Sequence, residues 1–270
     1  MTSTLTAFER PLLDEPLVVL SYAYSGIARL RRLIEDVPAL DWIGTDLVRA
    51  CDQVAGNWRD VEEHGDGFSR MAQTSIRSMF STMVMTRLAA SGAVRYCFPS
   101  GGSAQMAQRF AVLFPKAKFL CLHRTLLDVV YTAVQANPWG LNGSPCTHFT
   151  PPYPGNSVAA AAAYWVQQTG QLLAVERLHP DRVLRVKYEE LDASPDDTAN
   201  AVSALLEIAG TRGVRPAAGV TRPAELTPVG CGAAVPVDRI PPFLVTEANG
   251  LLTQLGYAPL PTAVSPNPQG

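Results

Sequence analysis

The stretch Phe114-Pro-Lys-Ala-Lys-Phe-Leu-Cys-Leu-His-Arg124 decides the fold. Together with the residues that follow, up to residue 134, this stretch predicts one complete strand-turn-helix unit of a parallel sheet. Its apolar run, residues 119–123, predicts a buried strand, and Arg124 and Thr125 predict the turn that ends the strand. Residues 127–134 then predict a helix. Ligands bind at the carboxyl ends of the strands in such sheets, so we expect Arg124 at a binding edge.

The same order of elements recurs elsewhere in the chain. An apolar run at residues 16–21 leads into a turn at 21–26, and from Ile27 onward apolar residues return at the spacing of a helix. The remaining predicted elements are a strand at 182–187 and helices at 69–91, 157–178, 194–210 and 242–255. This alternation predicts an α/β protein with an open, P-loop-like parallel sheet flanked by helices. We expect a single domain over residues 1–270.

Two long segments show no periodicity. Residues 137–156 are rich in Pro, Gly and Asn, and a loop of this length inside a compact domain predicts a lid or an acceptor-binding loop. Residues 211–240 are rich in Pro, Gly and Ala and predict irregular structure. Aromatic residues in the first loop, from Trp139 to Tyr153, and the tryptophans Trp42 and Trp58 either line an apolar acceptor pocket or pack in the core.

The composition excludes several classes of protein. Of the 270 residues, 47% are hydrophobic and 17% charged, which indicates a sizeable core and argues against disorder. The net charge of −2 gives no field that would attract nucleic acid or a membrane surface, and no apolar run has the length of a membrane span. The five cysteines form no CxxC pair, which favours free thiols in the cytoplasm over disulfides or a metal site. The oligomeric state stays open.

Arg124 is followed by Asp128 four residues later and by Thr132 eight residues later. This spacing resembles the 3′-phosphate-binding segment of the sulfotransferases that use 3′-phosphoadenylyl sulfate (PAPS). Residues 182–191, with Ser194-Pro195 after them, resemble a later strand and helix start of that family. The resemblance implies a sulfotransferase fold with PAPS as co-substrate. It also implies that Arg124 and Thr132 hold the 3′-phosphate, for which a guanidinium offers forked donors.

The turn at 21–26 stands where that family has its 5′-phosphosulfate loop, so the resemblance implies that this turn meets the sulfate end of PAPS. The family's loop carries a basic residue, a small residue, a glycine and two hydroxyl residues, of which only the small residue and the glycine remain here. In chain order the candidate residues are Tyr24 (basic position), Ser25, Gly26, Ile27 and Ala28 (hydroxyl positions). Backbone amides at a helix N-terminus attract anions whatever the side chains are.

Three further positions bear on the donor site. Arg29, one turn further along the helix, is either a replacement cation or an ordinary solvated arginine. Many relatives carry a lysine near the sulfate, and this chain has Cys97 or Phe98 there, neither of which supplies a charge. Residues 229–234 lack the arginine of a late family element that closes over the 3′-phosphate.

The catalytic base has three candidates. Some relatives place a glutamate shortly after the helix that follows the 5′ loop, and Asp46 lies in that neighbourhood. His64 and His148 lie in loops, and imidazole titrates near neutral pH, so each is an alternative. A helix cap or an exposed side chain explains each of these residues equally well.

Two functions follow from the resemblance. The first is transfer of a sulfuryl group from PAPS to a hydroxyl or amine of a small molecule, such as a natural product, with no metal. The second is a sulfotransferase-fold protein that has lost PAPS use and binds another ligand or catalyses a different reaction. A P-loop kinase or NTPase is disfavoured, because the sequence has no G-x-x-x-x-G-K-[ST] motif.

Overall fold

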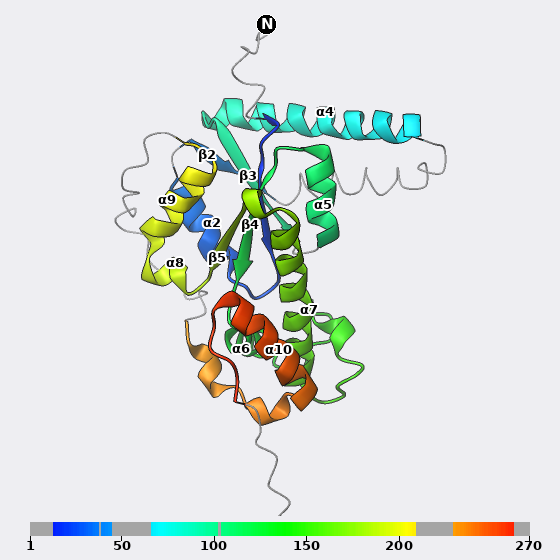
Figure 1. The fold of residues 1–270 in the computed structure, drawn as a ribbon, viewed down its shortest axis with the longest axis vertical. Coiled ribbons are helices and arrows are strands. Elements are labelled where there is room, and N and C mark those ends of the chain that lie inside the picture. The colour runs from blue at the N-terminus through cyan, green and yellow to red at the C-terminus, as the bar shows by residue number, and fades with distance from the viewer. Residues whose placement is uncertain (1–12, 38, 45–65, 102–103, 209–228, 262–270) are drawn as a thin grey trace, which may run out of the picture.

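The fold is built on five parallel strands in the order β2-β3-β1-β4-β5 (Figure 1). It is seen in a computed structural model that describes residues 13–37, 39–44, 66–101, 104–208 and 229–261. The strands are β1 (Leu17–Ser21), β2 (Leu40–Trp42), β3 (Arg95–Gly101), β4 (Lys118–His123) and β5 (Val183–Lys187).

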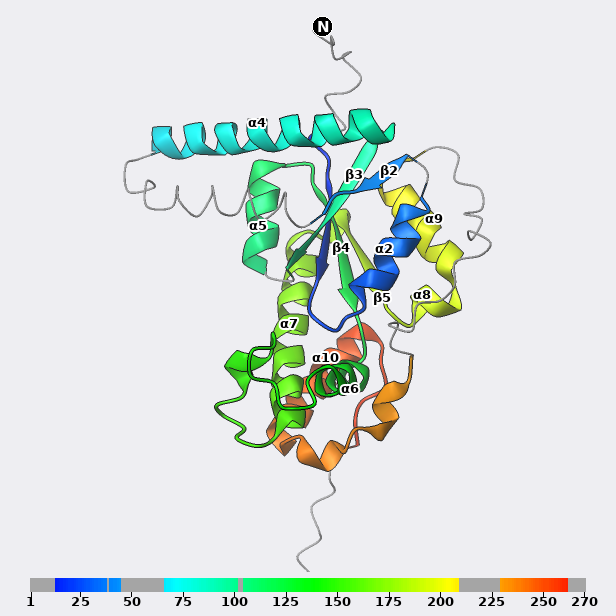
Figure 2. The same ribbon diagram turned by 180° about the vertical axis from the view of Figure 1, so that it is seen from behind.

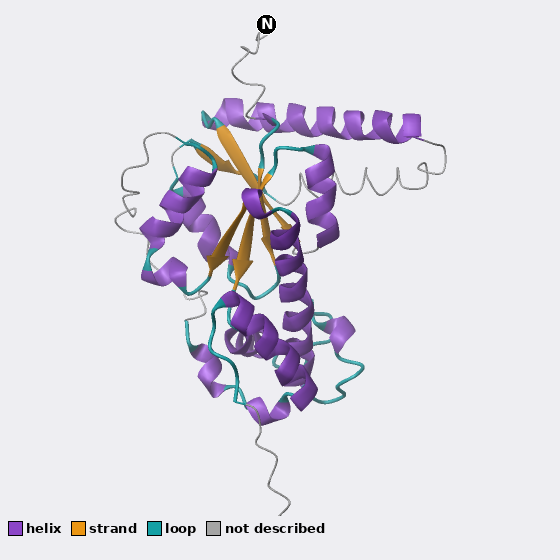
Figure 3. Cartoon of the chain, in the orientation of Figure 1, coloured by secondary structure: helices purple, strands orange, loops and turns teal. Residues whose placement is uncertain are grey.

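Helices cover both faces of the sheet and its carboxyl end (Figures 2 and 3). One face packs against α2 (Ile27–Glu35), α8 (Glu190–Ala193) and α9 (Pro195–Leu205). The other face packs against α4 (Asp66–Ser91), α5 (Ala104–Leu113) and α7 (Ser157–Leu178). Beyond the carboxyl ends of the strands lie α6 (Leu126–Ala136) and α10 (Pro242–Leu255) (Figure 1).

The central strand is buried on both faces. In β1, Leu17 and Val19 pack toward α2, whereas Val18 and Leu20 pack toward α5 and α7. A strand covered on both faces is apolar throughout rather than alternating, which is why the sequence of β1 shows an uninterrupted apolar run.

The predicted fold class is confirmed, and so are the strands β1, β4 and β5 and the helices α7 and α10. The sequence did not predict β2, β3 or α5, and α9 ends at Leu205 rather than near residue 210. Residues 229–240 form two short 3₁₀ helices, η4 (Cys231–Ala234) and η5 (Val237–Arg239); a further one, η3 (Pro180–Arg182), precedes β5. No helix in the described ranges is long and apolar enough to span a membrane.

The loop at 137–156 is a series of consecutive turns around η2 (Thr147–Phe149). Trp139 in this loop is 100% exposed, so it neither packs nor lines a pocket. Trp42 is buried in the core beside α2, which makes it a packing residue. Trp58 lies outside the described residues.

Candidate functional site

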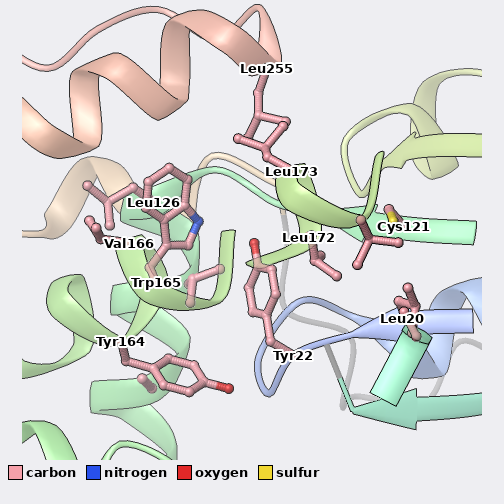
Figure 4. Close-up of a cluster of buried hydrophobic side chains, with 14 of the residues drawn as sticks. Leu20, Tyr22, Cys121, Leu126, Tyr164, Trp165, Val166, Leu172, Leu173 and Leu255 are labelled. Carbon is pink, nitrogen blue, oxygen red and sulfur yellow. The ribbon is translucent and has the colours of Figure 1, made fainter. Parts of the chain in front are cut away.

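The site begins where β1 and β4 end side by side at the carboxyl edge of the sheet. The backbone of Arg124, directly after β4, is held by two buried aromatic side chains. The carbonyl oxygen of Arg124 accepts a hydrogen bond from Trp165 Nε1 at 2.9 Å and one from the Tyr22 hydroxyl at 3.3 Å. Burial raises the pKa of Tyr22 to about 12, so this hydroxyl stays neutral. Figure 4 shows Tyr22 and Trp165 within one packed cluster.

The side chain of Arg124 meets Thr132 and is almost fully buried, with 1% of its surface exposed. Its Nη1 donates to Thr132 Oγ1 at 3.3 Å and to the carbonyl oxygen of Tyr24 at 3.0 Å. Thr132 in turn donates its hydroxyl hydrogen to the carbonyl oxygen of Asp128 at 2.6 Å. The guanidinium also stacks on the ring of Tyr188, 4.1 Å from the ring centroid. The structure therefore brings together the two residues that the sequence paired.

The turn between β1 and α2 is held from both sides. The amide of Ala23 donates to the hydroxyl of Tyr164 on α7 at 2.9 Å, and Ser25 Oγ donates to the carbonyl oxygen of Tyr22 at 2.7 Å. Tyr24 has a left-handed backbone, with φ at 68°, and its hydroxyl accepts a hydrogen bond from Asn137 Nδ2 at 3.0 Å. The Tyr24 side chain thus reaches the start of the 137–156 loop instead of supplying a charge to the turn.

Gly26 allows this turn to meet Tyr188. Its φ is 92°, and a Cβ atom at this position would lie 2.1 Å from Cε2 of the Tyr188 ring. Any other residue would therefore force the ring away from Arg124. Glycine is required here by both its backbone conformation and the close approach.

The N-terminus of α2 offers unused backbone donors. No described residue accepts a hydrogen bond from the amides of Ile27 or Ala28. The Ile27 side chain packs toward the core and Ala28 is exposed, and since neither side chain is polar, only their amides can donate to a ligand. The guanidinium carbon of Arg29 lies 5.8 Å from the Tyr188 ring centroid, so Arg29 and Arg124 contact the same ring. These amides and the helix dipole form an anion-attracting end beside Arg124.

The late segment without an arginine reaches the same place. Cys231 Sγ lies 4.0 Å from Nη2 of Arg124 and 3.5 Å from Oδ1 of Asp128. The thiol therefore lies between the guanidinium and the carboxylate. Burial, with the Asp128 carboxylate beside it, raises the pKa of Cys231 to about 11 and keeps the thiol protonated at neutral pH.

The structure corrects the position given to Cys97 and Phe98. Both are fully buried within β3, where they pair with Leu17 and Val18 at the beginning of β1. The end of β3 beside the turn is Gly101, which pairs with Ser21. Cys97 and Phe98 are core residues, so the prediction that one of them stands at the sulfate position is wrong.

Of the three candidate bases, only His148 lies in the described residues. It is exposed on η2, and the neighbouring Phe149 packs edge-on against Tyr164 at 5.6 Å between ring centroids. Asp46 and His64 lie outside the described residues. Within the described ranges, no group of three or more His, Cys, Asp or Glu side chains is arranged to hold a metal ion.

Sequence reasoning did not include Tyr188 or Tyr164 in the site. Tyr188 directly follows β5, and its place after a parallel strand was a signal that it stands at the binding edge. Tyr164 lies in the middle of the apolar helix α7, where nothing in the local pattern separates it from a packing residue.

Three solved structures share this fold over most of the chain. The sulfotransferase domain from the curacin biosynthetic pathway is 17% identical, with a TM-score of 0.55, and the match covers 92% of this chain and 99% of that one. The sulfotransferase domain from the Synechococcus PCC 7002 olefin synthase is 18% identical, with a TM-score of 0.50 and coverage of 92% of this chain and 96% of that one. A sulfotransferase from Alicyclobacillus acidocaldarius is 12% identical, with a TM-score of 0.51 and coverage of 90% and 96% respectively. At these identities the likeness is one of fold alone. No curated protein sequence matches the chain.

A family model gives the stronger result. The model described as "Sulfotransferase family" matches residues 29–211, which is more than half of the chain. The matched region contains Arg124 and Thr132 and begins within α2. The chain therefore belongs to the sulfotransferase family.

Proposed function

We propose that this protein transfers a sulfuryl group from PAPS to a hydroxyl or amine of a small molecule. The observation that carries the proposal is the contact between Arg124 and Thr132, whose Nη1 and Oγ1 atoms lie 3.3 Å apart at the carboxyl edge of the sheet. A guanidinium and a hydroxyl held this close can bind one phosphate group together.

The residues present fit the 3′-phosphate end of the donor. Arg124 is fixed through its backbone by Tyr22 and Trp165, so its guanidinium is oriented before any ligand arrives. Its bond to the Tyr24 carbonyl joins a cation to a neutral acceptor. A phosphate is a stronger partner than a neutral carbonyl, so we expect the ligand to displace Tyr24.

The residues present also fit the sulfate end of the donor, but they offer fewer positive charges there than the family's loop does. The amides of Ile27 and Ala28 and the α2 dipole attract an anion, and Arg29 is the cation nearest to them on α2. When bound, PAPS supplies the activated sulfuryl group, and the protein orients it and neutralises charge on the leaving oxygens. Tyr24 supplies none of that charge, which predicts slow turnover.

The acceptor and the base belong to the same proposal. We assign proton removal from the acceptor to Asp46, with His64 and His148 as the alternatives. Two of the structural relatives are domains of a biosynthetic pathway and of an olefin synthase, which supports a natural product as the acceptor. We place the reaction in the cytoplasm, where cysteines stay reduced.

One observation favours a second function. Arg124 is buried and its Nη1 already donates to the Tyr24 carbonyl, and the basic position of the turn holds Tyr24. Both features suit a sulfotransferase fold that no longer uses PAPS and binds another ligand.

The two functions differ in one measurement. The purified protein is incubated with PAPS and a panel of small alcohols, phenols and amines, and release of 3′-phosphoadenosine 5′-phosphate (PAP) is followed. Sulfuryl transfer predicts acceptor-dependent release that Arg124→Ala abolishes and that the exposed control Arg31→Ala retains. Failure to release PAP with any acceptor, together with failure to bind PAP, would overturn sulfuryl transfer and favour the second function.

A further inference from the structure

Asp128 holds a distant part of the chain with both of its carboxylate oxygens. It lies in the first turn of α6 and is buried, with 3% of its surface exposed. Oδ2 accepts a hydrogen bond from the amide of Gly230 at 2.9 Å, and Oδ1 accepts one from the amide of Gly232 at 2.7 Å. A buried polar group is stable only when it is hydrogen-bonded, and here both partners come from one short segment.

The segment from Gly230 to Gly232 is fitted closely against the start of α6. A Cβ atom on Gly232 would lie 2.5 Å from the backbone carbon of Leu127 and 2.7 Å from the amide nitrogen of Asp128. Gly230 has φ at 79°, a conformation that other residues adopt at a cost. The two glycines thus let both amides reach the carboxylate.

This attachment places Cys231 over the guanidinium. With its neighbours fixed on either side, Cys231 holds its Sγ atom 4.0 Å from Arg124 Nη2. The Gly230–Gly232 segment therefore forms one wall of the space around Arg124 and Thr132. Nothing else in the described turns ties this wall to α6 through a charged group.

We propose that Asp128 is a positioning residue that closes the Gly230–Gly232 segment over Arg124, and that this closure gives the protein its preference for a nucleotide with a 3′-phosphate. The preference rests on the proposed function, whereas the closure does not. Asp128 stays clear of the ligand and acts through the two amides that it holds.

A purely structural role for Asp128 makes a different prediction. An acidic residue in the first turn of a helix stabilises that helix through the helix dipole. Loss of the acid would then lower the stability of the protein and weaken the binding of every ligand alike. A positioning role predicts that only the binding of nucleotides with a 3′-phosphate is weakened. Comparing PAP with adenosine 5′-phosphate, which lacks the 3′-phosphate, separates the two roles.

The experiment uses the full chain and three variants. Asp128→Asn removes the negative charge and one of the two acceptor oxygens, because the amide nitrogen of Asn cannot accept a hydrogen bond. Gly232→Ala places a Cβ atom against the backbone of Leu127 and Asp128, and so opens the segment while it keeps the carboxylate. Asp238→Asn changes an exposed aspartate on η5, further along the same segment, and is the matched control. Circular dichroism and thermal unfolding confirm that each variant is folded.

The first readout is the rate at which iodoacetamide alkylates Cys231, assigned by peptide mapping. We expect about a tenfold faster reaction in Asp128→Asn and in Gly232→Ala, the effect of losing one hydrogen bond to a charged group. Asp238→Asn should react at the wild-type rate. Asp128→Asn also removes the carboxylate that raises the pKa of Cys231, so Gly232→Ala, which keeps it, is the deciding variant. Unchanged alkylation in Gly232→Ala would overturn the closure itself.

The second readout is affinity by calorimetry. We expect Asp128→Asn and Gly232→Ala to weaken PAP binding about tenfold while binding of adenosine 5′-phosphate stays at the wild-type value. Equal weakening of both nucleotides would overturn the positioning role. Failure of the wild-type protein to bind PAP would overturn the proposed function and the nucleotide preference with it, and the alkylation result would then decide the closure alone.

Discussion

Arg124 donates a hydrogen bond from Nη1 to the backbone carbonyl oxygen of Tyr24 at 3.0 Å, and this bond joins the end of β4 to the turn after β1. The two halves of the site are thereby coupled. An anion that binds the guanidinium breaks the hydrogen bond to the Tyr24 carbonyl, and a change in the turn alters the contacts of the Arg124 side chain.

Replacing Tyr24 by arginine should strengthen nucleotide binding. A guanidinium in the turn adds a charge-assisted hydrogen bond to the 5′-phosphate, which contributes about 1.5–3 kcal/mol, or roughly tenfold or more in affinity for PAP. Tyr24→Phe is the control, because it also loses the hydrogen bond from Asn137 but adds no charge. Calorimetry checks both variants. If Tyr24→Arg binds PAP no better than Tyr24→Phe, the turn does not face the 5′ end.

Gly26→Ala should destabilise the fold far more than Gly92→Ala. Both glycines have positive φ, so each substitution carries a left-handed penalty of about 1–2 kcal/mol. At Gly26 the new Cβ also overlaps the Tyr188 ring, whereas at Gly92 nothing lies within 4 Å. We expect Gly26→Ala to cost about 1–3 kcal/mol more, from overpacking, in urea unfolding. Equal losses would mean that the contact with Tyr188 is looser than described.

Glu189 should matter for stability and Glu190 should not. Glu189 accepts hydrogen bonds from the Thr125 amide at 3.0 Å and from the Tyr257 hydroxyl at 2.7 Å, and so ties the chain after β5 to the turn after β4. We expect Glu189→Gln to lower the unfolding free energy by about 1–3 kcal/mol. Glu190 is half-exposed and pairs with Lys187, so Glu190→Gln should cost at most about 0.5 kcal/mol. Thermal or urea unfolding of the two variants gives the comparison, and similar losses would refute the assignment.

Acid should destabilise the protein partly through Glu176. Burial raises the pKa of this carboxyl, but hydrogen bonds from His123 and Arg185 outweigh burial and hold the pKa below its usual value of 4.5. Because the pKa is lower in the folded state, the stabilisation is complete above the unfolded-state value and is lost as pH falls through the folded-state value. Urea unfolding over a series of acidic pH values should show a shallower loss of stability in Glu176→Gln than in the wild type. Parallel curves would contradict this.

The sequence predicts the central strands β1 and β4 better than it predicts β2 and β3. The strands β1 and β4 are continuous apolar runs because they lie in the middle of the sheet, and such runs stand out. β3 contains Pro99, which argues against a central strand, yet among the described residues β2 pairs only with Arg95–Cys97. Within the described residues, Pro99 therefore pairs with β1 alone, and proline is tolerated on such a stretch. β2 has only three residues, too few to show a period.

The contacts of the site between residues close in sequence were predictable, and those between residues far apart in sequence were not. Arg124 and Thr132 lie eight residues apart on one turn and helix, so their spacing indicated their contact. The contacts with Tyr188 and Cys231 join residues far apart in the chain, and no local pattern specifies them. The interpretation of Cys97 and Phe98 failed for a related reason, because without knowing the register of β3 the sequence does not reveal which of its residues reaches the sheet edge.

The most direct test of the central claim is the difference in affinity between PAP and adenosine 5′-phosphate, measured by calorimetry in the wild type, Arg124→Ala and Thr132→Val. If Arg124 and Thr132 hold a 3′-phosphate, the wild type binds PAP more tightly, by roughly tenfold or more for a charge-assisted bond. Thr132→Val should reduce that preference, and Arg124→Ala should abolish it. Equal affinity for both nucleotides in the wild type, or a preference that survives in Arg124→Ala, would contradict the account.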